Sequence, residues 1–299
     1  MAGLKLIRRR RREAEQAPMR LSAPVPGYLR VALGIAVALV FIAPVWWVVA
    51  ASFKPQFAIF RDAAPVTAAT FLPFDATLDN YREVFGRLGM GRALINSTIV
   101  AVSQVILTLV LCSTGAYAFS RLRFPGRRVL FIIILGTLLV PFESILIPMY
   151  LMASRLGLGD MLPAVFLPEI ASAFGLFLLR QAFDDVPREL DDAALVDGAS
   201  HFRVYFDVLL PNIKPALATL SVITFLWSWN GFLWPLVIIQ RPELQLIQVA
   251  LAQTVVPGEL PNWGAILAGA TIATVPVLIL FLLLQRYIVQ GFTESAMKG

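Results

Sequence analysis

The stretch DDVPRELDDAALVDGASHFRVYFDVLLP, residues 184–211, is acidic and broken by glycine and proline in a chain that is otherwise strongly apolar. Asp185 is a candidate N-cap and Pro187 belongs in a first helical turn, with Glu189 near the positive end of the helix dipole. Gly198 fits the position after the last turn, where a left-handed backbone costs little. A helix over residues 187–196 would be about 15 Å long, half of what a bilayer requires. This segment is therefore predicted to lie outside the membrane.

A second short helix is predicted to begin at the Ser200 cap and to end before Pro211. Its large apolar side chains recur with the helical period and form one stripe: Phe202, Tyr205, Phe206, Leu209 and Leu210. The stripe can pack under a helical bundle, which leaves Ala193 and Ala194 of the first helix facing outward. Because alanine lets another backbone approach closely, the acidic first helix is predicted to be a docking element.

The composition is that of a membrane protein. Hydrophobic residues make up 58% of the 299 residues, charged residues only 15%, and the mean hydropathy is +0.76, whereas a soluble domain is about half apolar and about a quarter charged. The net charge of +6 comes from basic clusters beside apolar runs, as orientation signals do, so nucleic-acid binding is not expected. The single cysteine, Cys112, excludes an internal disulfide framework and a multi-cysteine metal site.

Six apolar runs are long enough to cross a bilayer, which needs about 20 mostly apolar residues. They cover approximately residues 31–53, 93–120, 129–154, 161–179, 215–240 and 263–285. The first run is longer than a signal-peptide core and is expected to be a retained span. The predicted fold class is an all-α polytopic membrane protein with six transmembrane helices. Its expected parts are a basic segment 1–30, a six-span domain 31–290 that contains the loop 184–211, and a tail 291–299.

The distribution of basic residues predicts the orientation in the membrane. With six spans, 18 of the 25 Lys and Arg residues fall on the side of both termini and of the loop 184–211, and 7 on the other side. The side with more Lys and Arg is normally cytoplasmic. Both termini and the docking element are therefore expected in the cytoplasm, and the N-terminal arginines are expected to contact anionic lipid.

The sequence ELDDAALVDGASHFRVYFDVLLPNIKPAL, residues 189–217, resembles the EAA loop of ATP-binding cassette (ABC) importer permeases, in which E-A-A-x-x-x-G is followed by I-x-L-P. Asp192 stands where the family usually has glutamate, so the charge is kept on a shorter side chain. Four further stretches are similar, in order, to the maltose-type branch of this family: YAFSRLRFPGRR at 117–128, IPMYL at 147–151, WNGFLWPL at 229–236 and QRYIVQGFTESAMKG at 285–299.

This resemblance implies a MetI-like permease subunit of a binding-protein-dependent carbohydrate importer in the bacterial cytoplasmic membrane. The first helix of the loop would be the coupling helix, which sits in a cleft of a cytoplasmic ATPase subunit. Its coupling residues would be Glu189, Asp192, Ala193, Ala194, Asp197, Gly198 and Ala199. The other implied partners are a second homologous permease and an extracytoplasmic solute-binding protein. The chain has no G-x-x-x-x-G-K-[ST] phosphate loop, so ATP and Mg²⁺ are expected on the ATPase and no cofactor on this subunit.

Four residues within the spans are candidates for a substrate path. Glu143 and Glu169 are costly in hydrocarbon, so they either line such a path or form hydrogen bonds within the bundle. Trp229 and Asn230 offer an aromatic face and an amide to a sugar, but the tryptophans of this segment can equally be interface anchors and Asn230 an interhelical contact. The polar residues of the second span are expected to serve helix packing: Asn96, Ser97, Ser103, Gln104 and Thr108.

Three other functions are consistent with parts of the sequence. Permeases for glycerol 3-phosphate or related phosphodiesters share the same motifs, but no interior arginine cluster for phosphate is visible. A proton-coupled transporter could use Glu143 and Glu169 as a relay, but it would not need the coupling loop. A membrane-embedded enzyme would need a catalytic cluster, and His201, the only histidine, has no partner set for nucleophilic or metal catalysis. No catalytic or metal site is expected.

Overall fold

Among the residues that the structure describes, three helices are long and apolar enough to cross a membrane by themselves. They are α2 (Gly27–Ser52), α6 (Met90–Arg121) and α17 (Trp263–Met297), whose apolar part ends at Gln285. The structure is a computed structural model, and it describes residues 26–255 and 260–297, with no β-strand among them. The predicted segment 1–30 therefore lies almost wholly outside the described residues, and α17 continues as helix through residues 291–297 of the predicted tail.

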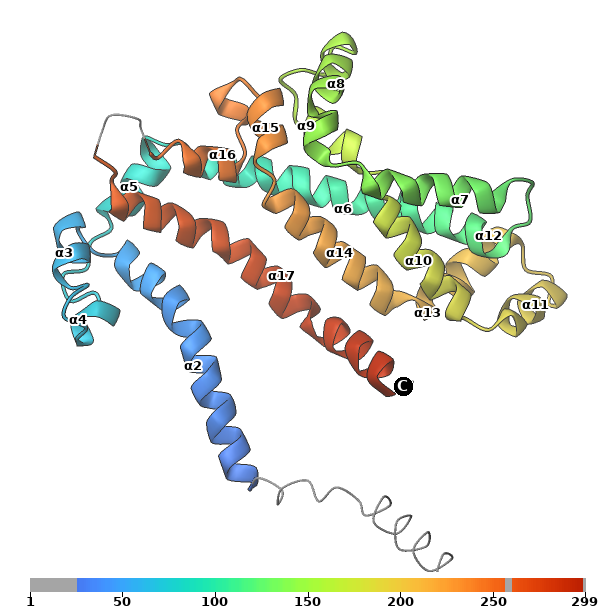
Figure 1. Ribbon diagram of the computed structural model, residues 1–299, viewed down its shortest axis with the longest axis horizontal. Helices are drawn as coiled ribbons and strands as arrows, with labels where there is room; N and C mark the ends of the chain where they lie inside the picture. The colour runs from blue at the N-terminus through green and yellow to red at the C-terminus, as the bar shows by residue number, and fades with distance from the viewer. Residues whose placement is uncertain (1–25, 256–259, 298–299) are drawn as a thin grey trace, which may run out of the picture. The chain divides into compact units, whose positions relative to one another are not determined.

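The chain forms two compact units, residues 1–47 and 48–299. In the described part of the first unit, α2 is apolar and solvent-exposed along its length. The end of α2, at Ala50, Ala51 and Ser52, is buried within the second unit. The second unit contains all other helices, and Figure 1 shows α14 (Lys214–Trp229) between α6 and α17 in that unit.

The third and fourth predicted spans are not straight helices. Residues 129–154 divide into α7 (Arg127–Gly136) with the 3₁₀ turn η1 (Thr137–Leu139), and α8 (Phe142–Arg155), with a bend of 102°. Residues 161–179 divide into α9 (Leu162–Phe166) with η2 (Leu167–Glu169), and α10 (Ala173–Asp185), with a bend of 50°. A third bent pair, His201–Asn212 with Lys214–Trp229, has a bend of 77°, so the described residues contain up to six spans if each bent pair counts as one.

The breaks have local causes. Pro141 has no N–H and places the residue before it in an extended conformation, so α7 cannot continue through it. Ser172 caps the start of α10, because its hydroxyl accepts a hydrogen bond from the backbone N–H of Gly175 at 3.0 Å.

The fifth predicted span, 215–240, is not one continuous helix either. α14 ends at Trp229, and a separate short helix, α15 (Leu233–Ile238), follows.

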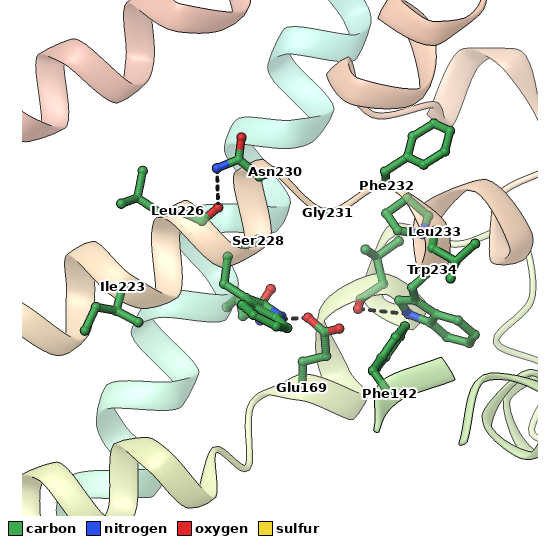
Figure 2. A pocket seen from close by; sticks show the side chains of 14 residues that line it. Phe142, Glu169, Ile223, Leu226, Ser228, Asn230, Gly231, Phe232, Leu233 and Trp234 are labelled. Carbon is green, nitrogen blue, oxygen red and sulfur yellow. Dashed lines mark hydrogen bonds between the residues drawn. The ribbon is translucent and has the colours of Figure 1, made fainter. Parts of the chain in front are cut away.

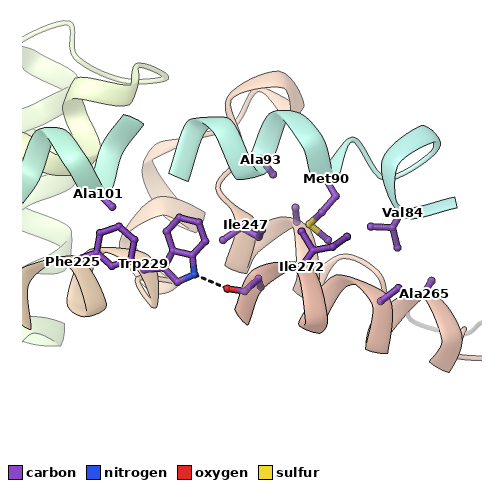
Figure 3. Packing of buried hydrophobic residues seen from close by; sticks show 12 residues of the cluster. Val84, Met90, Ala93, Ala101, Phe225, Trp229, Ile247, Ala265 and Ile272 are labelled. Atoms are coloured by element: carbon purple, nitrogen blue, oxygen red, sulfur yellow. Dashed lines mark hydrogen bonds between the residues drawn. The ribbon is translucent and has the colours of Figure 1, made fainter. Parts of the chain in front are cut away.

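The long helix α6 is central to the packing of the second unit, where it contacts α10 and α14 most extensively. One core cluster joins α6, α14 and α17, together with α5 (Asp79–Gly86), and includes Trp229 and Phe225 (Figure 3). These two rings stack at 5.4 Å, and the indole N–H of Trp229 donates to the carbonyl of Ala273 at 3.0 Å. α14 is thereby held between its two neighbours.

The polar connection after α2 is an ordered helical segment with α3 (Gln56–Arg61) and α4 (Ala68–Phe71) before α5. The ammonium of Lys54, which is 2% exposed, pairs with the carboxylate of Asp62 at 3.2 Å and donates to the carbonyl of Ala69. Asn80 of α5 donates to the carbonyls of Ser52 and Lys54, both at 2.8 Å. This network holds α5 against the end of α2.

Asp160 joins two loops, the one between α8 and α9 and the one between α15 and α16 (Ile247–Ala252). Its carboxylate accepts the backbone N–H groups of Gln240 at 2.6 Å and Arg241 at 2.9 Å. The pKa of Asp160 is lowered, first by the backbone N–H of Arg241 and then by that of Gln240. Because its pKa is lowered on folding, the ionised carboxylate stabilises the folded state at pH values above the ordinary carboxyl pKa. This contribution is lost as the pH falls through the lowered pKa.

We expect Asp160→Ala to lower the melting temperature near neutral pH and to have little further effect once the pH is below the lowered pKa of the folded state, where the carboxyl is protonated in the folded protein as well as in the unfolded chain. Thermal unfolding of the detergent-purified protein across this pH range measures the difference. Asp207→Ala is the matched control, because Asp207 is exposed and its ion pair with Arg203 is long, at 3.9 Å. If Asp160→Ala lowered the melting temperature by the same amount near neutral pH and at the acidic end of the range, the loss would not be electrostatic in origin.

Candidate functional site

The predicted docking helix is α11 (Arg188–Val196), on the loop that joins α10 to α14. Asp185 does not cap it, because Asp185 still belongs to α10, and the N-cap is Pro187, which had been expected inside the first turn. The expected left-handed residue after the helix is present: Gly198 has φ +83°. Backbone hydrogen bonds from Gly198 to Leu195 and from Ala199 to Ala194 close this end of α11.

The second helix of the loop begins at Ser200 as predicted, and the Ser200 hydroxyl accepts the backbone N–H of Arg203. It does not end before Pro211. It runs through α12 (His201–Arg203), the π-helix η3 (Val204–Leu209) and α13 (Leu210–Asn212).

The π-helix changes which residues of this helix are buried. Its i→i+5 hydrogen bonds widen the turn, so the apolar face no longer follows the α-helical period. Its buried residues are Val204, Tyr205 and Leu209, and Ile213 directly after α13 is also buried. Phe202 and Phe206 were predicted to pack inward, but they are 72% and 46% exposed.

One face of α11 is exposed along its whole length. It consists of residues with the spacing i, i+3, i+4, i+7 and i+8, named here the α11 stripe: Glu189, Asp192, Ala193, Val196 and Asp197. The stripe combines carboxylates at its edges with a small residue at its centre and Val196, which is 87% exposed. Ala194 was expected to share this face, but it is half-buried and packs with Ala199 against the core cluster around Tyr205.

The opposite side of α11 is fixed to the end of α6 by a buried ion pair. The Nε of Arg121 lies 2.5 Å from a carboxylate oxygen of Asp191, and the two side chains are 7% and 11% exposed. Arg121 also donates to the carbonyl of Val186 at 2.8 Å, and Arg188 donates to the carbonyl of Ser120 at 3.3 Å. The pKa of Asp191 is raised, because the effect of burial exceeds the opposing effect of the Arg121 charge. The ion pair thus joins the loop to α6, the helix that is central to the packing of the second unit.

A second candidate site lies between α6, α9, α10 and α14. Two cavities of about 530 and 510 Å³ adjoin there. They share five lining residues: Gln104, Phe142, Glu169, Ile223 and Trp227. The amide of Gln104 donates to the carboxylate of Glu169 at 3.0 Å, and Figure 2 shows Glu169 and Asn230 on the lining of the first cavity.

Of the four predicted path residues, the cavities include Glu169 and Asn230 but not the other two. Trp229 is 2% exposed and packs in the core. Glu143 is exposed in the first turn of α8 and lines neither cavity, whereas its neighbour Phe142 lines both. Asn230 donates to the carbonyl of Leu226 at 2.8 Å, the preceding turn of its own helix (Figure 2).

Four of the five polar residues predicted to serve packing in α6 divide into two groups. Asn96 donates to the carbonyls of Glu243 and Gln245, and the hydroxyl of Ser97 accepts the backbone N–H of Ile247, so both serve packing as predicted. Gln104 and Thr108 instead line the cavities, a role that the sequence did not indicate. The helical period alone could have suggested it, because these two residues are four apart and share one face.

Two further features of the site were missed. Trp227 and Ser228 both line the first cavity, although only their neighbours Trp229 and Asn230 were selected from the sequence.

In residues 26–255 and 260–297, no group of three or more His, Cys, Asp or Glu side chains could hold a metal ion.

These features define a polytopic, all-helical membrane protein with a short exposed loop helix and cavities among its membrane helices. The chain belongs to the family of binding-protein-dependent transport system inner membrane components, whose model matches residues 113–294. The resemblance of the EAA-like loop to this family is confirmed.

Relatives and a solved structure agree with this assignment. The chain is 32% identical to the arabinooligosaccharides transport system permease protein AraQ of Halalkalibacterium halodurans, over 94% of this chain and 99% of the relative. It is 32% identical to the sn-glycerol-3-phosphate transport system permease protein UgpE of Brucella abortus, over 90% and 95%. Its fold is similar to a bacterial ABC transporter involved in the import of the acidic polysaccharide alginate, with a TM-score of 0.75, 26% identity, and coverage of 88% of this chain and 96% of that chain.

Proposed function

We propose that the chain is a permease subunit of an ATP-driven importer, and that the α11 stripe binds a separate ATPase subunit in the cytoplasm. The α11 stripe carries this proposal. It is an exposed helix face with acidic edges, and Ala193 at its centre allows close approach of another backbone. A basic cleft of a partner would bury Val196 and pair with the carboxylates. The chain has no phosphate loop of its own, so the partner must supply ATP hydrolysis.

The basic residues support the orientation that this role requires. With both termini and the loop on the cytoplasmic side, that side carries 18 of the 25 Lys and Arg residues. A second homologous permease and an extracytoplasmic solute-binding protein complete the proposed importer. This subunit would transmit motion of the ATPase through α11 as a rigid element and would itself be non-catalytic.

The proposed cargo is a sugar or oligosaccharide. The cavities combine the aromatic rings of Phe142 and Trp227 with amide groups of Gln104 and Asn230. Relatives whose names state arabinooligosaccharides or lactose as cargo support this class. Glycerol 3-phosphate is the alternative, since UgpE is also a relative, but neither cavity has a Lys, Arg or His on its lining for a phosphate.

Site-directed cross-linking tests the proposal. In a Cys112→Ser background, which removes the only native cysteine, Ala193→Cys gives a unique thiol on the α11 stripe. We expect a membrane-impermeant thiol reagent to label it in inside-out vesicles and not in intact spheroplasts. A short bifunctional cross-linker should join it to the ATPase encoded with the importer. Labelling from the outside, or no cross-link in the assembled complex, would contradict the proposal.

A bulky residue at the centre of the stripe should block docking. We expect Ala193→Trp to weaken ATPase binding by about thirtyfold, the effect of losing about 2 kcal/mol at an interface centre, and to abolish uptake at normal membrane abundance. Co-purification of the ATPase and uptake by cells measure this. Leu195→Trp is the control, because Leu195 is exposed on the same helix but points away from the centre of the stripe. Equal loss in both variants would indicate a general fault of α11.

A further inference from the structure

We propose that an aromatic surface, formed by the exposed rings of Phe57, Phe60 and Trp263, lies in the lipid headgroup layer and anchors the Trp263 end of α17 to the bilayer. This inference concerns the contact with lipid, and it depends neither on the cargo nor on the proposed ATPase contact. It requires only that α17 spans the membrane, for which this helix is long and apolar enough.

The three rings lie together on the second unit, where α3 packs beside the start of α17 (Figure 1). Phe57 and Phe60 are three residues apart on α3, and both are more than half exposed. The ring of Phe60 meets that of Trp263 edge-on, with centroids 6.3 Å apart. The side-chain amide of Gln56 donates to the carbonyl of Pro261 at 3.2 Å, which joins the start of α3 to the segment before α17. The aromatic surface is therefore shared between α3 and α17.

The depth of the aromatic surface follows from the position of Trp263. The apolar part of α17 that can cross a bilayer runs from Trp263 to Gln285, so Trp263 is the first residue of this span. Tryptophan is enriched at this depth in membrane proteins, where its ring lies among the headgroups. Trp263 also begins a row of at least partly exposed residues with helical spacing: Ile266, Ala270 and Thr274. The aromatic surface is thus continuous with a face of the span that the described part of the second unit leaves open.

The charges beside the aromatic surface are paired with one another. Lys54 pairs with Asp62 at 3.2 Å. Arg61 pairs with Asp62 and with Asp75, each at 2.8 Å, and its guanidinium lies over the Phe57 ring, 5.5 Å from the centroid. These two cations and two carboxylates leave no net charge to attract a charged protein surface. Exposed rings with paired polar groups at their edge suit the headgroup layer, which is apolar on one side and wet on the other.

Fluorescence quenching by spin-labelled lipid tests this placement. In the Cys112→Ser background, Phe57→Cys carries a thiol-reactive fluorophore. The protein is reconstituted into phosphatidylcholine nanodiscs, both alone and as the complex that co-purifies from its native membrane. We expect lipid labelled at the headgroup to quench the fluorophore more strongly than lipid labelled near the end of the acyl chain. Arg82→Cys is the control, because Arg82 belongs to an exposed ion pair with Asp79, and its label should be quenched by iodide in the water and little by either lipid.

Quenching at headgroup depth in both preparations would support the lipid contact. Absence of lipid quenching in both, or stronger quenching by the deep label, would overturn it. Lipid quenching of the chain alone that is lost in the complex would assign the aromatic surface to a protein partner, and this result would also overturn the inference. None of these outcomes bears on the proposed importer function, which the cross-linking experiment at Ala193 tests separately.

Replacing one ring tests whether the lipid contact stabilises the protein. Phe57 is suitable because it is exposed and its ring contacts the Arg61 guanidinium. In nanodiscs, Phe57→Ser should lower the melting temperature, since it removes an apolar ring from the headgroup layer, whereas Phe57→Trp should not, because tryptophan is favoured at this depth. Equal melting temperatures of the wild type and both variants would contradict insertion, because an exposed ring in water can be replaced at little cost. An equal loss in both variants would show that the ring is held by fit within the protein, which would also overturn the inference.

Discussion

Replacing Gly264 by alanine is expected to prevent the normal packing of α17 on α5. A Cβ at this position would lie 2.3 Å from the side-chain oxygen of Asn80 and 2.6 Å from its Cγ. Asn80 is buried and cannot swing aside without losing its two hydrogen bonds to the carbonyls of Ser52 and Lys54. Overpacking costs about 1–3 kcal/mol, and each buried polar group left unpaired costs about 1–3 kcal/mol more.

The expected result is a strong loss of folded, monodisperse protein after detergent extraction, with a lowered melting temperature for what remains. Gly136→Ala is the control, because Gly136 is also helical and a Cβ there would meet nothing within 4 Å. The double variant Gly264→Ala with Asn80→Ala should recover part of the loss, since it removes the clash but leaves two carbonyls unpaired. A Gly264→Ala protein as stable as the wild type would contradict the close approach of the two helices.

The sequence predicts those parts of the fold that depend on local rules. A charge-free run such as that of α6 or of α17 is long enough to cross a bilayer whatever its neighbours are, and both are found as continuous helices. Gly198 after α11 and the Ser200 cap follow from backbone and capping preferences within a few residues. The family resemblance rests on similar local stretches, and the matched family model confirms it.

The breaks of the middle spans could not be predicted from hydropathy, which counts apolar residues and does not register where a helix bends. Pro141 and the Ser172 cap, whose hydroxyl accepts the backbone N–H of Gly175, are local features that a count of apolar residues does not include. The same limit applies to the tryptophans. In a segment that is apolar on all sides, no periodicity separates Trp229, which is in the core, from Trp227, which lines the cavities.

In the acidic run of α11, a pairing side chain from elsewhere in the chain determines which carboxylate is buried. Glu189, Asp191 and Asp192 have similar chemistry and lie within one turn, yet Asp191 alone of the three is buried. Its burial is possible because Arg121, from a distant part of the chain, supplies the opposite charge. In the sequence, Arg121 was one of the basic residues used to predict the orientation in the membrane, and no pairing with Asp191 was predicted.

Replacing Arg121 by alanine is expected to abolish uptake while leaving the protein inserted in the membrane. The change leaves the Asp191 carboxylate buried without its counter-charge, which typically costs about 3–5 kcal/mol. It also removes the hydrogen bond to the carbonyl of Val186. Both losses loosen α11 from the end of α6, so a movement of α11 would no longer reach the membrane helices. In the importer proposed above, ATP hydrolysis should then persist without stimulation by the loaded solute-binding protein.

The paired variant Arg121→Met with Asp191→Leu separates attachment from charge. A buried ion pair can often be replaced by apolar residues of similar volume without loss of stability. If the ion pair serves only to attach α11 to α6, this variant should therefore regain uptake and stimulated ATP hydrolysis. Arg203→Ala is the control, because its pair with Asp207 is exposed on both sides and exposed pairs contribute little. If the single Arg121 variant transports normally, α11 must reach the membrane helices through its second attachment, the Tyr205 cluster. If the paired variant is stable but inactive, the charges themselves take part in coupling.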